Sequence, residues 1–231
     1  MMYRNFFFLS ILTLFISCSS PANSPEFIKK TTGRYLYNSD EVIEVYFENE
    51  ELFLKWRGAN SIKPMNVGNQ QFFVKEMNEK IEFSTDSSSK NQFLTLVPKD
   101  DNDTIINNFR KLAVNEKIPS EYLKDNEFDK ALEGYLNIKK NDSLDNSLNE
   151  NNFNSLGYKE LRKNNFENAL NIFKINMMLY PNSSNVYDSY ADALKVKGDT
   201  LQAIIYYKKS LKLDSGNRRA KSFVEKYDKK E

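Results

Sequence analysis

The chain has 231 residues, enough for two modest domains, and its 33 Lys and Arg residues nearly balance its 32 Asp and Glu residues. A net charge of +1 gives no electrostatic basis for binding nucleic acid. The chain has no histidine and a single cysteine, Cys18. These counts exclude the commonest general base, the commonest metal ligand and a disulfide framework.

The N-terminus has the pattern of an export signal. Arg4 precedes an apolar run from Phe6 to Ile16, which ends at small residues around Cys18. A basic start, about eleven apolar residues and a small residue before a cleavage point are typical of a secretory signal peptide. The run is short for a membrane-spanning helix, which needs roughly 20 apolar residues. Phe15-Ile16-Ser17-Cys18 resembles a bacterial lipobox, in which the cysteine is lipid-modified and becomes the first mature residue.

We therefore expect residues 1–18 to be a lipoprotein signal peptide, Cys18 to be the lipidated residue, and residues 19–25 to be a short tether. This predicts a protein of the bacterial cell envelope, held in the outer membrane by its lipid anchor and facing the periplasm. The alternative is a simple cleaved signal peptide with a coincidental cysteine.

Residues 26–110 are predicted to form a β domain, because apolar residues alternate with period two from Gly33 to about Arg110. Residues 43–47 and 52–56 flank the polar break Glu48-Asn49-Glu50 and predict a hairpin. Further apolar stretches lie at 71–74, 80–83 and 92–97, and we expect seven or eight short strands in the whole segment. This spacing predicts an antiparallel meander that forms a small barrel or sandwich. Its expected core is Leu36/Tyr37, Ile43, Val45, Leu54, Trp56, Phe73, Ile81, Phe83, Phe93 and Leu96.

Two copies of a 34-residue unit follow, at residues 150–183 and 184–216. Ala169-Leu170 with Phe173 in the first copy recurs as Ala203-Ile204 with Tyr207 in the second. The first copy is framed by Phe153, Leu156, Gly157 and Pro181, and the second by Tyr187, Tyr190, Ala191 and Ser215. This pattern resembles the tetratricopeptide repeat, a helical hairpin that packs on the next hairpin. We expect small residues where helices touch, and Phe173 and Tyr207 between successive hairpins.

Residues 111–149 resemble a degenerate hairpin of the same kind. Its apolar positions recur with four extra residues, at an offset of 38, in the pairs Phe128/Phe166, Ala131/Ala169, Leu132/Leu170 and Tyr135/Phe173. We place the insertion between Asn141 and Asn152 and expect a short helix from Pro119 to Lys124.

The last segment, residues 217–231, predicts a capping helix. Its apolar face is Ala220, Phe223, Val224 and Tyr227, and its Lys and Arg side chains are expected in solvent. The predicted fold class is α+β, an N-terminal antiparallel β meander followed by a C-terminal α-helical tetratricopeptide solenoid.

The two halves together resemble the C-terminal tail of exported bacterial serine hydrolases related to β-lactamases. The resemblance rests on Thr32-Gly33-Arg34-Tyr35, Gly157-Tyr158, residues 179–183 and residues 186–189. In that family a β-rich, lipocalin-like domain and a short tetratricopeptide segment follow the catalytic domain, for which this chain has no room. Ser87-Ser88-Ser89-Lys90 matches the nucleophile motif only formally, because its composition predicts a turn between strands. We therefore expect a non-enzymatic protein with no metal and no cofactor.

Three functions remain open on the sequence alone. In the first, the concave face of the tetratricopeptide helices binds a protein or peptide partner, although the helices could also do no more than pack against the β half. The expected partner-binding residues on this face are Asn154, Tyr158, Arg162, Asp188, Asp192 and Lys195. The alternative is a small β-barrel ligand-binding protein, for which an internal cavity of ~300 Å³ or more would be needed, or an accessory subunit of a separately encoded serine hydrolase.

Overall fold

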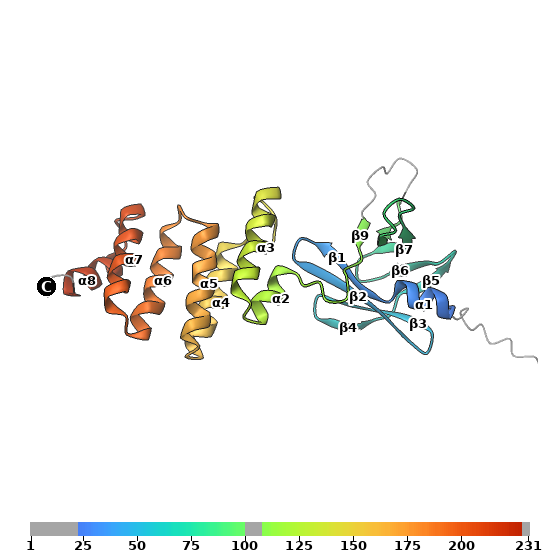
Figure 1. Cartoon of the computed structure of the whole chain (residues 1–231), viewed down its shortest axis with the longest axis horizontal. Helices are drawn as coiled ribbons and strands as arrows, with labels where there is room; N and C mark the ends of the chain where they lie inside the picture. Colours follow the sequence, from blue (N-terminus) through green and yellow to red (C-terminus); the bar gives the residue numbers. More distant parts are fainter. Residues whose placement is uncertain (1–22, 100–107, 228–231) are drawn as a thin grey trace, which may run out of the picture. The chain divides into compact units, whose positions relative to one another are not determined.

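The computed structural model of the chain describes residues 23–99 and 108–227 (Figure 1). The predicted signal peptide, Cys18 and most of the predicted tether lie outside these ranges. No helix in the described ranges has the length and apolar character needed to cross a membrane. The described residues divide into two compact units, one with residues 23–34, 43–99 and 108, the other with residues 35–42 and 109–227. Residues 35–42, part of the predicted β domain, thus group with the helices.

The described strands form two antiparallel sheets in which each strand pairs with its neighbour in sequence. This confirms the predicted antiparallel β half. The four-stranded sheet contains β1 (Gly33–Asn38), β2 (Glu41–Glu48), β3 (Glu51–Trp56) and β4 (Ala59–Ile62). The five-stranded sheet contains β5 (Met65–Gly68), β6 (Gln71–Val74), β7 (Glu79–Thr85), β8 (Gln92–Leu96) and β9 (Asn108–Arg110).

The β2–β3 hairpin forms as predicted, with Val45 paired to Leu54 and residues 49–50 in the turn. Asn49 and Glu50 both adopt left-handed backbone angles, with φ of 47° and 65°. Two consecutive residues of this kind are typical of the tight turn whose twist matches that of the flanking strands. The turn therefore fixes the register that buries one face of both strands.

The predicted β core is correct in β2, β3 and at Ile81, and wrong in three other strands. Tyr35 is buried in place of Leu36/Tyr37, Phe72 and Val74 in place of Phe73, and Leu94 in place of Phe93 and Leu96, while Phe83 is half-buried. In each of these strands apolar residues are adjacent, so alternation alone does not say which set faces inward. A shift by one residue exchanges the two faces of a strand.

Helix α1 (Pro25–Thr31) departs from the expected tether, which was to extend to Pro25. Ser24 Oγ accepts a hydrogen bond of 3.1 Å from Phe27 N, which caps the helix, and Pro25 occupies its first turn. The Phe27 ring lies 6.1 Å from the Phe47 ring of one sheet and 6.1 Å from the Phe72 ring of the other. Helix α1 thus contacts both sheets. Ser24-Pro25-Glu26 is a helix-start signal that was available in the sequence.

Helices follow the sheets, and the first of them has the bounds predicted for it, Pro119–Lys124. They are α2 (Pro119–Lys124), α3 (Phe128–Asn141), α4 (Glu150–Arg162), α5 (Phe166–Leu179), α6 (Ser184–Lys197), α7 (Thr200–Leu213) and α8 (Arg218–Tyr227). Residues 142–149 separate α3 from α4, whereas only 180–183 separate α5 from α6. The four inserted residues therefore lie where the offset predicts them.

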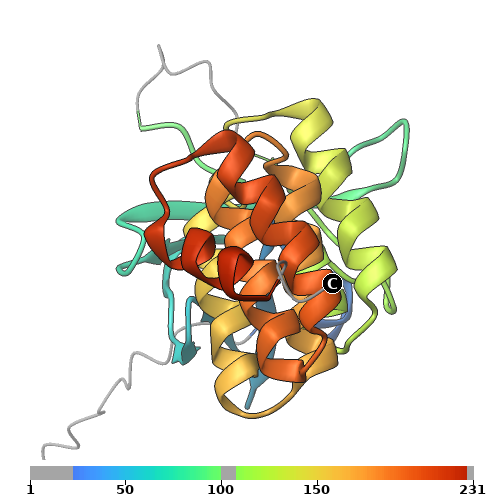
Figure 2. The same cartoon turned by 90° about the vertical axis from the view of Figure 1, so that its left-hand side faces the viewer.

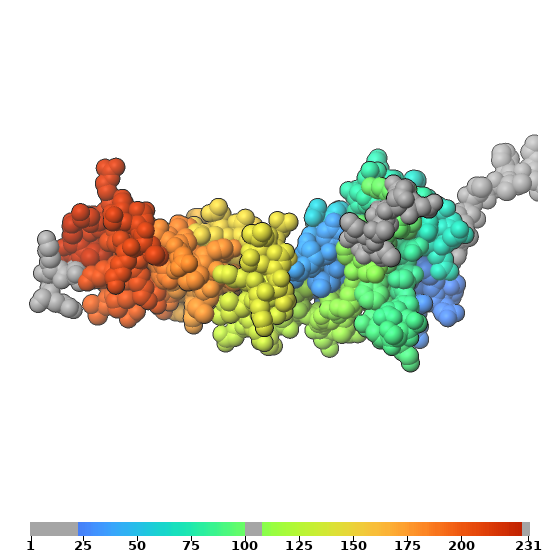
Figure 3. Space-filling view, turned by 90° about the horizontal axis from the view of Figure 1, so that it is seen from above, coloured from blue at the N-terminus to red at the C-terminus, as the bar shows by residue number. Residues whose placement is uncertain are grey.

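Consecutive helices of this unit pack side by side as hairpins (Figure 1; Figure 2). A Cβ atom on Gly157 of α4 would lie 2.4 Å from the Phe173 ring of α5, so only glycine permits this contact. In the degenerate hairpin the small residue is on the other helix, because a Cβ on Gly134 of α3 would lie 2.6 Å from Pro119 of α2. Within the helical unit the colours in Figure 3 follow one another in sequence order, since each hairpin packs on the next.

The β1–β2 connection is fixed to the first helices by a half-buried aspartate. Asp40 accepts hydrogen bonds from the Ser120 backbone N–H at 2.7 Å and from the Tyr135 hydroxyl at 2.9 Å. Ile118, at the N-cap position of α2, has no side-chain acceptor, so Asp40 supplies one from a distant segment. Ser39 adds a hydrogen bond of 2.5 Å to Asp145 after α3. These contacts explain why residues 35–42 group with the helices.

Candidate functional site

Helices α4 and α6 carry matching rows of polar side chains. Asn154 and Tyr158 lie one turn apart on α4, and Asp188 and Asp192 lie one turn apart on α6, so each pair shares a helix face. The two rows are separated by one 34-residue repeat. The Tyr158 hydroxyl donates a hydrogen bond of 2.8 Å to Asp192 Oδ2, which joins the two hairpins directly.

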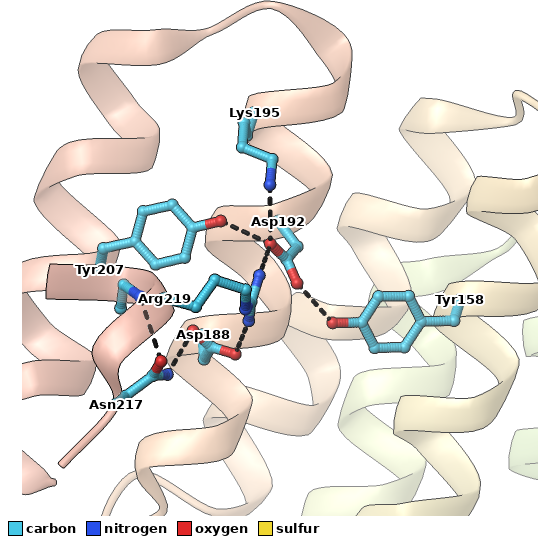
Figure 4. A network of polar contacts seen from close by, with 8 residues as sticks. Tyr158, Asp188, Asp192, Lys195, Tyr207, Asn217 and Arg219 are labelled. Atoms are coloured by element: carbon cyan, nitrogen blue, oxygen red, sulfur yellow. Dashed lines mark hydrogen bonds and ion pairs between the residues drawn. The ribbon is translucent and has the colours of Figure 1, made fainter. Parts of the chain in front are cut away.

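Asp192 is the centre of a network that draws on four helices. Besides Tyr158 of α4, Tyr207 of α7 donates a hydrogen bond of 2.5 Å to its Oδ1. Arg219 of α8 forms an ion pair with the same oxygen, and Lys195 Nζ lies 3.5 Å from it. Both oxygens of the carboxylate therefore have donors (Figure 4).

Asp188 ties the beginning of α8 to α6. Its Oδ2 accepts from Arg219, whose guanidinium thereby bridges Asp188 and Asp192. Its Oδ1 accepts a hydrogen bond of 2.8 Å from the side chain of Asn217. Asn217 in turn accepts one of 3.1 Å from Ala220 N and so caps α8. The first turn of α8 is thus held by two polar side chains.

The two aspartates of this network differ in their electrostatics. Burial alone would raise the pKa of Asp192, but hydrogen bonds from Tyr207, Arg219 and Tyr158 outweigh it and hold the pKa below its usual value. Burial raises the pKa of Asp188, and the Arg219 charge offsets this only in part. Burial and the neighbouring aspartates raise the pKa of Tyr158 to about 12, so its hydroxyl stays a donor at neutral pH.

The predicted partner-binding residues fall into two groups. Tyr158, Asp188 and Asp192 are brought together, but the expectation that they are freely exposed is wrong, because the two aspartate side chains are only 12% and 13% exposed. Arg162 and Lys195 are exposed, as expected. Asn154 is intermediate, and its side-chain oxygen is buried with no hydrogen-bond partner among the described residues.

Three residues of the network were not predicted: Tyr207, Asn217 and Arg219. Tyr207 was assigned to hairpin packing alone, and the Arg219 side chain is exposed, as expected, but its contacts with Asp188 and Asp192 were not foreseen. The sequence does contain a signal for Arg219. It lies 34 residues after Asn185 of α6, so the repeat period gives it the equivalent position on α8. Asn217 before an apolar helical face is likewise a recognisable N-cap.

The formal nucleophile motif lies in an exposed turn between β7 and β8. Asp86 accepts hydrogen bonds from the Ser88 backbone and from the Ser88 and Ser89 hydroxyls, which shapes this turn and lowers the pKa of Asp86 to about 2. Lys90 has a left-handed φ of 57° and belongs to the same turn. In residues 23–99 and 108–227 no three Cys, Asp or Glu side chains lie close enough to hold a metal ion.

The β unit has a cavity of about 650 Å³ beside the β2–β3 turn and the β4–β5 connection. Leu52 and Phe72 line it together with the ion pair Lys63–Glu51, whose atoms lie 2.6 Å apart. Most of its other lining residues are exposed. Side chains from β2, β3, β6, β7 and β8 fill the inner faces of the sheets, so this cavity is a surface hollow rather than the interior of a barrel.

No protein-family model matches the chain, and no curated protein matches it. Among solved structures, the first tetratricopeptide domain of Spaghetti (RPAP3) bound to an HSP90 peptide is similar over 48% of this chain and 85% of its own, at 18% identity and a TM-score of 0.34. The Arabidopsis OM64 tetratricopeptide domain is similar over 49% and 90%, at 18% identity and a TM-score of 0.34. The Yersinia enterocolitica type III secretion chaperone SycD, in complex with a peptide of the translocator YopD, is similar over 49% and 89%, at 16% identity and a TM-score of 0.34.

The tetratricopeptide-like character of the helical unit is evident from its own repeat. Helix pairs α4–α5 and α6–α7 recur after 34 residues with the same small and aromatic positions buried. Ala169 and Ala203 are completely buried, as are Phe173 and, nearly so, Tyr207. Phe173 contacts Gly157 within its own hairpin and also belongs to the core that includes Ala191 of the next one.

Proposed function

We propose that this protein is a non-enzymatic scaffold of the bacterial cell envelope, anchored through Cys18, that binds a protein or peptide partner across the α4–α6 face. The observation that carries the proposal is the repeat-matched pair of rows, Asn154 with Tyr158 on α4 and Asp188 with Asp192 on α6. Side chains held in place on packed helices can bind a partner without first losing rotamer freedom.

Asn154 supplies the clearest sign of an absent partner. Its buried side-chain oxygen has no donor among the residues that the structure describes. A buried acceptor left without a hydrogen bond costs roughly 1–3 kcal/mol, and a backbone N–H or side-chain donor of a bound peptide would remove that cost. Exposed Arg162 and Lys195 lie on the same two helices and can contact acidic or carbonyl groups of the same peptide.

Site-specific photocrosslinking tests the proposed face in the full chain. A photoreactive amino acid is placed at Arg162 or Lys195, and at exposed Lys174 of α5 or Lys212 of α7 as matched controls. We expect one specific adduct in intact cells from the first two positions and none from the controls. Equal labelling from all four positions, or labelling from the controls alone, contradicts the proposal.

A binding variant must leave the fold intact. Tyr158 is unsuitable for replacement by alanine, because its ring packs edge-on against Phe173 at 5.1 Å. The double variant Arg162→Ala with Lys195→Ala changes two exposed positions, for which stability changes stay within about 0.5 kcal/mol. We expect it to lose the crosslinked partner from a probe at Asn151 while its melting temperature stays unchanged. A partner retained at wild-type yield would contradict a role for these two cations.

The lipid anchor has its own test. We expect Cys18→Ser to abolish palmitate labelling and to leave the precursor uncleaved, because stable membrane attachment needs more than one acyl chain and these are added at the cysteine. Cys18→Ser protein that is processed normally and released in soluble form would favour the simple cleaved signal peptide. Continued palmitate labelling of the variant would show that Cys18 is not the lipidated residue.

A further inference from the structure

Arg219 is the part of the α4–α6 face that comes from outside the repeats. Its guanidinium bridges Asp188 and Asp192, which lie one turn apart on α6. We propose that these aspartates form a binding site for an arginine of the partner, which Arg219 occupies until the partner displaces it together with the first turn of α8. The proposal rests on the proposed function and names the chemistry of the partner and the means by which the face is opened.

The geometry suits arginine rather than lysine. One terminal nitrogen of Arg219 contacts Asp192 Oδ1 and the other contacts Asp188 Oδ2, so each carboxylate receives its own donor. A planar guanidinium presents donors in a fixed fork, whereas an ammonium group is a single point charge. Arg219 therefore acts as a model, within the chain, of the group that the two aspartates recognise.

Without α8, Asp192 keeps two hydrogen bonds, while Asp188 loses those from Asn217 and Arg219 and is held by the packing of α6 alone. Tyr158 of α4 and Tyr207 of α7 bind the two oxygens of Asp192 at 2.8 Å and 2.5 Å. Helix α6 itself is fixed by buried residues along its length, among them Val186, Ala191 and Leu194. Removal of Arg219 would thus leave an assembled site rather than a collapsed one.

Helix α8 is held much less firmly than the helices it covers. In its described residues only Ala220 is buried, whereas six residues of α6 and four of α7 are buried. The Arg219 side chain is 49% exposed. Terminal elements with few buried contacts open at low free energy. Opening without a partner is nevertheless disfavoured, because it leaves two mostly buried carboxylates without their shared cation. A second cation removes that penalty, which couples α8 release to arginine entry.

One further side chain points to a ligand at this place. Asn154 holds the position on α4 that Asp188 holds on α6, and its buried side-chain oxygen has no donor among the described residues. A peptide whose arginine enters between the aspartates can bring a backbone N–H to Asn154.

The test uses a defined probe, the tripeptide acetyl-glycyl-arginyl-glycinamide, with the full chain. Arg219→Gln removes the internal competitor, and Arg218→Gln changes the adjacent exposed arginine as a matched control. A tethered group competes at an effective concentration on the order of millimolar, so we expect Arg219→Gln to bind the probe about tenfold more tightly than wild type or Arg218→Gln. Analogues with lysine or citrulline in place of arginine should bind at least about tenfold more weakly to the Arg219→Gln protein, because they lack the charged fork.

Wild-type protein provides a measurement that does not depend on the stability of a variant. In a backbone-amide NMR titration with the same tripeptide, we expect the signals of α6 around Asp192 and those of α8 to shift together. The α8 signals should move towards random-coil chemical shifts. Shifts in α6 with α8 unchanged, equal affinity of Arg219→Gln and wild type, or equal binding of the citrulline analogue would each overturn the proposal. If the tripeptide tests fail while photocrosslinking from Arg162 and Lys195 succeeds, the proposed scaffold function is still supported and only the proposed arginine chemistry of the partner is wrong.

Discussion

Tyr135 and Tyr207 hold the same repeat position in the first and last hairpins of the helical unit, and each donates a hydrogen bond to an aspartate. Tyr135 binds Asp40 at 2.9 Å, and Tyr207 binds Asp192 at 2.5 Å. Phe173 holds the position in the middle hairpin without a hydroxyl group. One aromatic position thus fills the core in every hairpin, while its hydroxyl serves a different purpose at each end.

The two aspartates differ in what neutralises them. The groups that donate hydrogen bonds to Asp40, Ser120 and the Tyr135 hydroxyl, are neutral, and burial raises the pKa of Asp40 despite them. Asp192 is bound by the Arg219 cation, and its pKa is lowered. A carboxylate satisfied by neutral groups of packed helices acts as a fixed clamp. A carboxylate that depends on a cation from a terminal helix can exchange that cation for another.

The largest effect is expected from removing either ring. Tyr135 is 3% exposed and Tyr207 1%, so replacement of either by alanine leaves a cavity that costs about 3–5 kcal/mol. Urea-induced unfolding, followed by circular dichroism, measures the loss. A cost below about 1 kcal/mol at either position would show that the repeat has been assigned to the wrong residues there.

Removing only the hydroxyl group of Tyr135 or Tyr207 should destabilise the protein by different amounts. Tyr135→Phe leaves Asp40 hydrogen-bonded to Ser120 alone and should cost about 1–2 kcal/mol. Tyr207→Phe should cost less than about 1 kcal/mol, because Asp192 keeps Tyr158 and Arg219. The exposed Tyr187 hydroxyl, bonded to Pro181 O, is the matched control, and Tyr187→Phe should be nearly neutral. The reverse order of the first two costs would contradict the comparison.

The helical half was predictable because its repeat period shows directly which residues occupy the buried positions. The offset of 34 residues identifies buried Ala169, Phe173 and Ala203 directly, and the offset of 38 locates the insertion before α4. Strands β6 and β8 gave no such phase, because Phe72 and Phe73, or Phe93 and Leu94, are equally apolar neighbours. Only the packing of the sheets decides which residue of each pair faces inward.

The candidate site was predictable only within the repeats. Tyr158 and Asp192 lie one repeat apart, so the sequence brings them together, but it does not show that their polar atoms are already bonded. Arg219 belongs to a helix expected only to cap the stack, and basic residues at the end of a chain are usually solvated. Asp40 and Tyr135 are 95 residues apart, and no local pattern links a β-turn to a helix core.

The smallest expected effect, and the sharpest test of the comparison, is the pH dependence of two aspartate-to-asparagine variants. The folded-state pKa of Asp192 is lowered, so its ionised form stabilises the fold above the unfolded-state pKa of about 3.9, and this contribution is lost as the pH falls through the folded-state pKa. The cost of Asp192→Asn should therefore be largest near neutral pH and shrink in acid.

Asp40 should behave in the opposite way. Its folded-state pKa is raised, so the stability that comes from binding a proton is complete below the unfolded-state pKa and is lost as the pH rises through the folded-state pKa. The cost of Asp40→Asn should therefore be largest in acid and shrink towards neutral pH.

One experiment tests both expectations. When the free energy of unfolding is measured between about pH 3 and pH 7, the costs of the two variants relative to wild type should change with pH in opposite directions. Asp192 is also faced by Asp188, Lys195, Tyr158 and Tyr207, and Asp40 by Asp145 and Tyr135, so each difference is taken against wild type at the same pH. Slopes of the same sign would mean that the Arg219 cation does not make Asp192 titrate differently from Asp40. The proposal that Asp192 can exchange Arg219 for another cation would then lose its electrostatic basis.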